Sequence, residues 1–162
     1  MLDLYIDIDA HAVYSQALRV AQRHSLELYV VTKDYLHGDP TVHLIAAQED
    51  QASGSAWIIG NITRGDICVT GDPGLALNCL VLGALALSPT GRQWSGRDVD
   101  GDTKGSVEPW SPDARTFVQR LEQAIASTRV VGPRSFTSPR DLSRPGLIDR
   151  HQGVPTSRLA FA

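Results

Sequence analysis

Two aspartates stand two residues apart in the run LDLYIDIDA near the start of the chain. If a strand continues through them, Asp7 and Asp9 face the same side, because alternate side chains of a strand point the same way. A third aspartate, Asp72, follows the apolar segment DICVT and precedes Pro73. Carboxylate oxygens are the ligands that Mg²⁺ and Mn²⁺ prefer. The three acids therefore predict a divalent-cation site, provided that their two segments are neighbouring strands.

The same residues also have structural interpretations. Asp9 and Asp72 each stand at the start of a predicted helix, where aspartate is a good cap. His11 follows Asp9 by two residues and is either a general base or metal ligand, or a helix N-terminal residue exposed to solvent. Each of these residues keeps both interpretations at this point.

The elements that must position these side chains alternate between strands and helices. Alternation and β-branched residues predict strands at 2–8, 26–32, 41–46, 66–70 and 84–87. Apolar residues at helical spacing, with Pro73 and Pro112 as opening residues, predict helices at 12–24, 56–62, 73–82 and 112–127. This order predicts an α/β domain with a mainly parallel central sheet covered by helices. Ligands of such sheets bind at the carboxyl ends of the strands, where the three aspartates fall.

Composition narrows the class of protein. The chain has 162 residues, of which 42% are hydrophobic and 20% charged, and no apolar run is long enough for a membrane helix. The N-terminus lacks the basic and then apolar order of a secretory signal, so we expect a cytoplasmic protein with no membrane partner. Cys68 and Cys79 lie in apolar segments and are expected to be buried thiols. A net charge of −3 argues against tight non-specific nucleic-acid binding.

Charge is unevenly distributed along the chain. Residues 1–72 carry four basic and ten acidic side chains, whereas residues 73–162 carry eleven basic and eight acidic ones. The acidic front half suits cation binding, and the arginine-rich back half suits either phosphate binding or a solvated surface. Gly, Asp and Ser are frequent in 89–112 and the segment has no periodicity, which predicts a long loop. We expect one domain over 1–142 and a flexible Pro- and Arg-containing tail over 143–162.

Three segments carry a resemblance to a known family. The opening LYIDIDAHAV resembles the DADACPV signature of the YaiI/YqxD family of bacterial PIN-like proteins. The stretch GDICVTGDPGLALNCLVLGALALSPTGRQWS is similar to that family's TxD motif and the Gly-Ala turn and Pro-x-Gly that follow it. A third segment, GPRSFT at 132–137, is similar to the family's GPK-x-FT. Three matches in order identify the chain as a diverged member.

The resemblance implies a PIN-like three-layer fold, whose active members are nucleases that depend on Mg²⁺ or Mn²⁺. It implies that Asp7, Asp9 and Asp72 are the catalytic and metal-binding residues, acting on RNA, a nucleotide or another phosphodiester. Thr70, His11 and Arg134 are then candidates for substrate binding. Thr70 would bond either a ligand carboxylate or a substrate phosphate, and its alternative is a plain residue at a strand end.

Departures from the family pattern sustain a second hypothesis. The family's Cys-Pro after the second aspartate is replaced by His11 and Ala12, and its middle DxAD motif aligns with Ala52 and Ser55. The nearest acids, Glu49 and Asp50, reach those positions only if the loop shifts. Two hypotheses follow: a metal-dependent nuclease, or a catalytically degenerate PIN-like module that binds a nucleotide, nucleic acid or protein. Neither hypothesis sets the oligomeric state.

Overall fold

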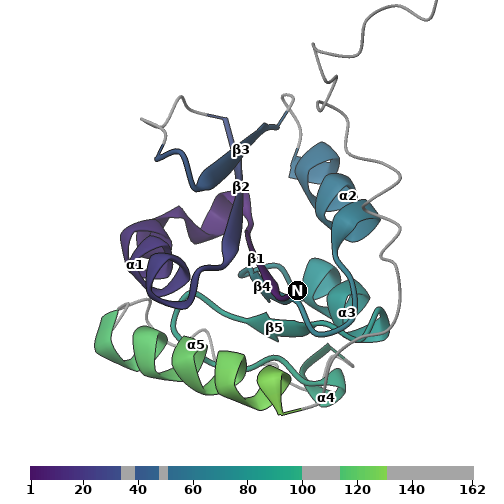
Figure 1. Ribbon diagram of the computed structural model, residues 1–162. Coiled ribbons are helices and arrows are strands. Elements are labelled where there is room, and N and C mark those ends of the chain that lie inside the picture. The colour runs from purple at the N-terminus through teal and green to yellow at the C-terminus, as the bar shows by residue number, and fades with distance from the viewer. Residues whose placement is uncertain (34–38, 48–50, 100–113, 131–162) are drawn as a thin grey trace, which may run out of the picture.

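The computed structural model describes residues 1–33, 39–47, 51–99 and 114–130 (Figure 1). Its centre is a sheet of five parallel strands in the order β3-β2-β1-β4-β5. The strands are β1 (Asp3–Ile6), β2 (Glu27–Thr32), β3 (Val42–Ala46), β4 (Ile67–Val69) and β5 (Leu85–Leu87). The helices are the 3-10 helix η1 (Ile8–Val13), α1 (Tyr14–His24), α2 (Gln51–Asn61), α3 (Pro73–Val81), α4 (Gly96–Val99) and α5 (Ala114–Arg129).

Helices cover both faces of this sheet, α1 and α5 on one side and α2 and α3 on the other (Figure 1). The predicted α/β class is therefore confirmed, and the three-layer arrangement is consistent with a PIN-like fold. The strand order reverses between β1 and β4, because β2 and β3 extend the sheet on one side of β1 while β4 and β5 extend it on the other. Such a reversal leaves a crevice at the carboxyl ends of the two central strands.

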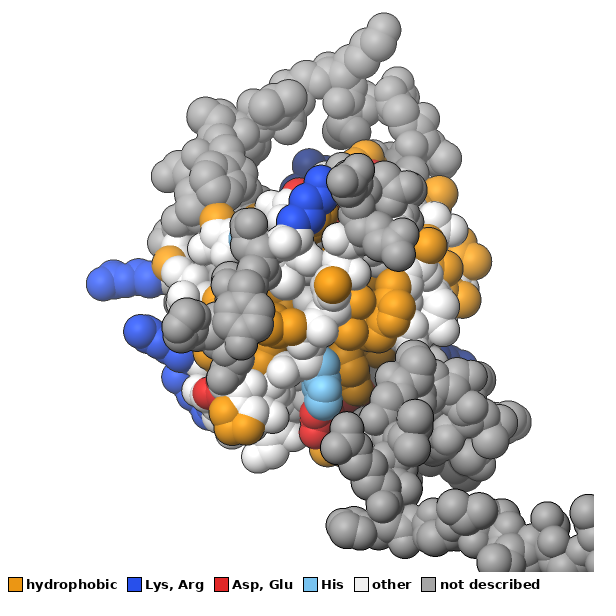
Figure 2. Space-filling model, turned by 90° about the horizontal axis from the view of Figure 1, so that it is seen from above, with side chains coloured by type: hydrophobic (Ala, Val, Ile, Leu, Met, Phe, Trp, Pro, Cys, Tyr) orange, Lys and Arg blue, Asp and Glu red, His pale blue; other side chains and the backbone are white. Residues whose placement is uncertain are grey.

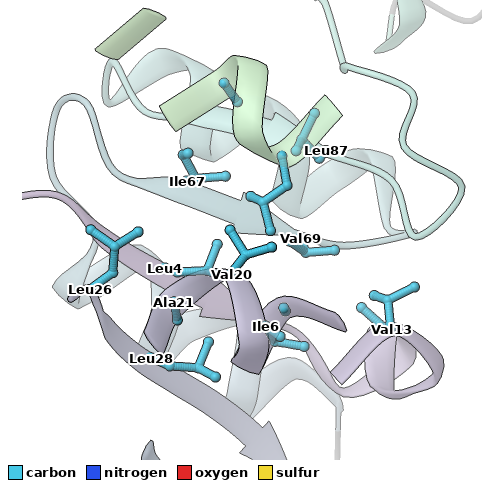
Figure 3. Close-up of a cluster of buried hydrophobic side chains, with 14 of the residues drawn as sticks. Leu4, Ile6, Val13, Val20, Ala21, Leu26, Leu28, Ile67, Val69 and Leu87 are labelled. Atoms are coloured by element: carbon cyan, nitrogen blue, oxygen red, sulfur yellow. The ribbon is translucent and has the colours of Figure 1, made fainter. Parts of the chain in front are cut away.

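Two buried clusters hold the layers together. The first lies between the sheet and helices α1 and α5, and Figure 3 shows Leu4, Ile6 and Val69 of the central strands meeting Val20 and Ala21 of α1. The second lies under α2 and α3 and is built on Tyr5, Tyr29 and Ile58. Residues of β1 alternate between the clusters, so both faces of that strand are buried, as a parallel sheet requires.

Polar contacts fix α5 against α1. Glu122 of α5 accepts hydrogen bonds from Arg23, at 2.7 Å, and from His24. The guanidinium of Arg129 donates to the carbonyl oxygen of His24 at 3.1 Å. These contacts lie at the end of α1, where Ser25 adopts a left-handed conformation and stops the helix.

The second helix and the segment after β5 differ from the sequence prediction. Helix α2 begins at Gln51 and not near 56. Its first turns contain Ser53, Gly54 and Ser55 and have little intrinsic helix propensity. They are helical because the burial of Ile58 and Ile62 stabilises the helix as a whole. The predicted loop at 89–112 contains the short helix α4. The backbone N–H and hydroxyl of Ser95 both donate to Asp98, at 2.8 and 2.6 Å, so the Asp98 carboxylate provides one of the two bonds of a capping box.

The edge strand β3 is less covered than the others. Its residues Val42, His43, Leu44 and Ile45 are all half-buried, and His43 pairs with Glu27 of β2. Viewed from above, the molecule shows a band of hydrophobic side chains beside a histidine and acidic side chains (Figure 2). The central strands of the sheet are thus buried, whereas the edge strand β3 is only half-buried.

Three further sequence predictions concern the cysteines, the membrane and the tail. Cys68 and Cys79 are free thiols and fully buried, as predicted. Their contact and their burial raise the pKa of the Cys68 thiol well above its ordinary value. Within the described ranges, no helix is long and apolar enough to cross a membrane. The predicted tail at 143–162 and the GPRSFT segment lie outside the described residues.

Gly91 provides a test of how the loop after β5 meets α5. Its φ is +89°, and an added Cβ would lie 3.0 Å from the Cα of Phe117. Because both the backbone conformation and the helix would have to adjust, we expect Gly91→Ala to lower the unfolding free energy by about 1–3 kcal/mol. Urea denaturation measures this change. Gly96→Ala is the control, since a Cβ there meets nothing within 4 Å, and it should be neutral or slightly stabilising. Equal effects of the two substitutions would contradict the packing described.

Candidate functional site

The carboxyl ends of β1 and β4 meet at the reversal of strand order. Asp7 directly follows β1, and its backbone N–H donates to the carbonyl oxygen of Val69 at 2.9 Å, which extends the pairing of the two strands. Thr70 directly follows β4, and Asp72 precedes α3. The sequence prediction that the two acidic segments are neighbours and parallel is confirmed.

Asp7 and Asp9 reach this place by a route that the sequence analysis did not predict. The strand ends at Ile6, and Asp7 caps the 3-10 helix η1 by accepting a hydrogen bond from the N–H of Ile8 at 2.8 Å. Strand alternation therefore does not align the two carboxylates, and that part of the prediction was wrong. The turn into η1 instead carries Asp9 forward over the end of β4.

Thr70 is the junction between the acidic segments. Its hydroxyl donates to Asp7 Oδ2 at 2.9 Å and accepts from the N–H of Asp72 at 2.9 Å. Both Thr70 and Asp7 are fully buried. Thr70 thus bonds a candidate ligand carboxylate, which is one of the roles considered for it, and is more than a plain residue at a strand end.

Asp9 lies over Gly71 and is exposed to solvent. The N–H of Gly71 donates to both carboxylate oxygens of Asp9, each at 3.1 Å. A Cβ on Gly71 would come within 2.9 Å of Asp9 Oδ2, so only glycine leaves the carboxylate in this position. Asp9 is therefore held to the loop between β4 and α3 and is not the cap of α1.

Asp72 is the N-cap of α3. Its Oδ1 accepts from the N–H of Gly74 at 2.9 Å, and Pro73 occupies the first helical turn. The capping interpretation is thus correct for Asp72, while its half-buried side chain also stays close enough to Asp7 and Asp9 to act on them electrostatically. A cap and a member of an acidic site are compatible roles, because Oδ2 receives no donor from the described residues.

Burial and mutual repulsion make this cluster electrostatically strained. Burial raises the pKa of Asp7, and the charges of Asp9 and Asp72 raise it further, against the lowering effect of the bonds from Ile8 and Thr70. Partial burial also raises the pKa of Asp9, as does the charge of Asp72, while hydrogen bonds with the Gly71 N–H and the Asp7 side chain lower it. No lysine or arginine among the described residues forms an ion pair with these three carboxylates. The negative charge at the strand ends is therefore uncompensated by nearby cationic side chains.

His11 is neither an exposed residue at a helix N-terminus nor seen in contact with the carboxylates. Its Nε2 lies 3.2 Å from the carbonyl oxygen of Val31 at the end of β2, and its side chain is half-buried. The ring therefore bridges η1 to β2. Arg134, the third candidate for substrate binding, lies outside the described residues.

The donor set limits the kind of metal site that this cluster can form. In the described part of the chain, no three or more His, Cys, Asp or Glu side chains are grouped so as to hold a metal ion. A cage of three protein carboxylates is therefore not built here. Mg²⁺ is commonly bound by only one or two carboxylates while keeping several waters. Asp9 and Asp72, the two members that face solvent at least in part, fit a water-rich site of that kind.

The positions aligned with the family's middle acids lie at the same end of the sheet. Because β3 runs parallel to the other strands, the first turns of α2 follow its carboxyl end, on the side of the acidic cluster. Ser55 stands in this part of α2 as a half-buried residue. The helix start thus brings a hydroxyl, and no carboxylate, to this end of the sheet. Glu49 and Asp50 lie outside the described residues.

Two residues of the site were missed by the sequence analysis. Gly71 was detectable, because a glycine between a strand and a capping aspartate often permits close approach of another group. Trp94 was not among the candidate site residues. Its indole N–H donates to the carbonyl oxygen of Thr70 at 3.0 Å and so ties the segment after β5 to the site. A buried indole needs such an acceptor, but sequence alone does not say which one.

The fold and this acidic junction define a three-layer α/β protein with carboxylates at a strand-order reversal. Residues 5–104 match the profile described as "Uncharacterized BCR, YaiI/YqxD family". The chain belongs to the YaiI/YqxD family.

Curated relatives match a larger share of the chain. A UPF0178 protein of Rhodospirillum rubrum is 33% identical in an alignment of 147 positions that covers 79% of this chain and 98% of that protein. One from Rhodospirillum centenum is 31% identical and covers 80% of this chain and 98% of its own. One from Rhodopseudomonas palustris strain BisB18 is 34% identical, covering 86% and 84%. No solved structure matches the chain.

The raised pKa values make a prediction about stability and pH. The folded state binds protons at Asp7 and Asp9 more tightly than the unfolded chain, whose carboxyl pKa is 3.8. Their contribution to stability is therefore present in acid and is lost as the pH rises through the folded-state pKa values. Asp7→Asn should remove the Asp7 part, so the unfolding free energy of the variant relative to the native protein should increase from pH 4 toward neutral pH.

Urea unfolding at several pH values measures this difference. Asp39→Asn is the matched control with the opposite sign, because hydrogen bonds from Thr41 lower the pKa of Asp39. That group stabilises the fold above its unfolded pKa, and its contribution is lost as the pH falls through the folded pKa. A difference between Asp7→Asn and the native protein that does not vary with pH would contradict the strained cluster.

Proposed function

We propose that this chain is a divalent-cation-dependent phosphodiesterase that hydrolyses RNA or a related phosphodiester at Asp7, Asp9 and Asp72. The observation that carries the proposal is the convergence of the three carboxylates at the carboxyl ends of β1 and β4, with repulsion among them and no cationic partner among the described residues. Such crowding is stable mainly when a cation or a proton relieves it. Crowded carboxylates lower the stability of the fold, so a site that keeps them is a candidate for function.

The residues divide into an inner and an outer group. Asp9 and Asp72 are the outer ones and would hold Mg²⁺ or Mn²⁺ together with water and a substrate phosphate. The ion would supply charge stabilisation of the phosphate oxygens and an activated water. Asp7, buried beneath them, adds negative potential at the site, and Thr70 fixes its orientation.

The protein's own residues do the positioning. The N–H of Gly71 holds both oxygens of Asp9, and Thr70 links Asp7 to the backbone of Asp72. These bonds set the separation of the carboxylates before any substrate arrives, which is the preorganisation that phosphoryl transfer needs. Positioning groups behind metal ligands commonly change affinity or activity by about 10–100-fold.

A second candidate function is a PIN-like module that binds a nucleotide, nucleic acid or protein without cleaving it. One observation favours it: each carboxylate already accepts a backbone hydrogen bond. The resemblance adds a second argument, since it sets Ser55 where an acid of the middle motif is expected. In this function the acidic junction is a structural connection between η1, β4 and α3. The two candidates differ in whether the cluster needs a cation.

Cleavage of a fluorescent RNA oligonucleotide with Mg²⁺, Mn²⁺ or EDTA separates the candidates. We expect cleavage with either metal, none in EDTA, and its loss in Asp9→Asn. Thr70→Val should slow the reaction by about 10–100-fold, since it removes a positioning bond. Asp39→Asn is the control, because Asp39 precedes β3 at the opposite end of the parallel sheet. Binding of the oligonucleotide in EDTA with no cleavage in either metal would establish the non-catalytic module in place of the nuclease.

A further inference from the structure

The two helices on one face of the sheet carry no charged side chain. Neither the eleven residues of α2, QASGSAWIIGN, nor the nine of α3, PGLALNCLV, include Asp, Glu, Lys or Arg. In the whole chain 20% of residues are charged. The helices of the other face differ, because α1 contains Arg19 and Arg23 and α5 contains Arg115, Arg120 and Glu122. Helices α2 and α3 are thus uncharged, and the charges next to them are those of α4, which packs beside α3 and carries Arg97 and Asp98.

The α2–α3 face also exposes large apolar side chains. Val81 is 77% exposed, Leu82 41% and Leu77 38%, and all three belong to α3 or its C-cap. Next to them, α2 presents the small exposed residues Ala56 and Gly60, and an added Cβ on Gly60 would meet nothing within 4 Å. Adjacent exposed apolar residues in a surface depleted of charge are typical of a protein–protein interface.

Charges at the two ends of α3 indicate which partner fits. At its N-terminus stand Asp72 and the exposed Asp9. At its C-terminus the stem of Arg64 packs over Gly83, with Arg64 Cγ 3.0 Å from the site of a Cβ there. The guanidinium forms no ion pair with the described residues. The helix is therefore apolar along its length, acidic at one end and basic at the other.

Such a surface is complementary to itself in one orientation. When two copies of α3 pack antiparallel about a two-fold axis near Leu77, the apolar residues meet at the centre, and each acidic end faces the basic end of the other copy. A nine-residue helix is only about 14 Å long, so the opposed ends lie at the rim of one compact contact. A stable interface buries about 800 Å² of each partner. Because one face of a nine-residue helix is smaller than this, the interface also includes the outer residues of α2.

We infer that the α2–α3 face is the interface of a homodimer in which α3 packs antiparallel on its copy, and that Arg64 of the partner subunit lies against Asp9 and Asp72. The dimer supplies the cationic side chain that the acidic site lacks among its own described residues. It also places one acidic site at each end of the paired helices. This interface forms whether or not the chain cleaves RNA.

Sedimentation equilibrium of the full chain tests the dimer. We expect a mass of twice 17.5 kDa at micromolar concentration. Val81→Glu should give a monomer, because it puts a negative charge into the apolar contact, toward the acidic end of the other copy. Val130→Glu should remain a dimer, since Val130 is 86% exposed but follows α5 on the other face. A monomeric native protein, or a Val81→Glu variant that still dimerises, would overturn the inference, and a partner other than a second copy would then be the occupant of this face.

Two further variants test the orientation. Leu77→Cys should form a disulfide between subunits on oxidation, because position 77 meets its own copy at the axis, whereas the native Cys68 and Cys79 are fully buried. Val130→Cys should not cross-link. Arg64→Glu should weaken dimerisation by about tenfold or more, since it sets a negative charge against Asp9 and Asp72. A dimer that neither cross-links at 77 nor responds to Arg64→Glu would show that the antiparallel arrangement is wrong.

Discussion

The hydrogen bond from the Thr70 hydroxyl to Asp7 joins the ends of the two central strands, and the geometry of the site depends on it. Thr70 and Asp7 are 63 residues apart in the chain, and both are fully buried. The same hydroxyl accepts from the backbone of Asp72 and so fixes where α3 begins. A buried carboxylate without donors is costly, so the bonds from Thr70 and Ile8 offset part of the desolvation that burial imposes. What remains uncompensated is the repulsion among three carboxylates.

The location of the acidic cluster determines which groups could relieve this repulsion. The cluster lies at the reversal of strand order, where the fold leaves a crevice, and the loop with Gly71 keeps Asp9 at its rim. Helix α3 starts at the cluster and continues into the neutral α2–α3 face. A cation at the carboxylates and an arginine from a second copy are two ways of relieving the same repulsion, and they are compatible because Mg²⁺ leaves much of its coordination shell to water.

The sequence predicted the layers and the neighbourhood of the site, because both follow from local patterns. Alternating strand and helix periods require a parallel sheet, and parallel strands gather their carboxyl ends at one edge. The exact ends of the helices and strands and the individual side-chain contacts could not be predicted from the sequence. Asp7 follows the end of the strand and its side chain caps η1, while its backbone N–H bonds Val69 of β4. Both contacts depend on how the chain packs and not on the local sequence pattern. The start of α2 depends on burial of Ile58, and the role of Trp94 depends on which carbonyl lies beside it. The bond between Ser95 and Asp98 at the start of α4, by contrast, could have been predicted from the spacing in SGRD.

The most direct test of the strained acidic cluster is carbon-13 NMR titration of the side-chain carboxyl groups of Asp7, Asp9 and Asp72, with and without Mg²⁺. Strain of the kind described places the pKa values of Asp7 and Asp9 above the ordinary 3.8, and a bound cation brings them down. The same titration of Asp39, whose pKa lies below 3.8, serves as an internal reference. Values for Asp7 and Asp9 at or below 3.8 that do not respond to Mg²⁺ would contradict the account.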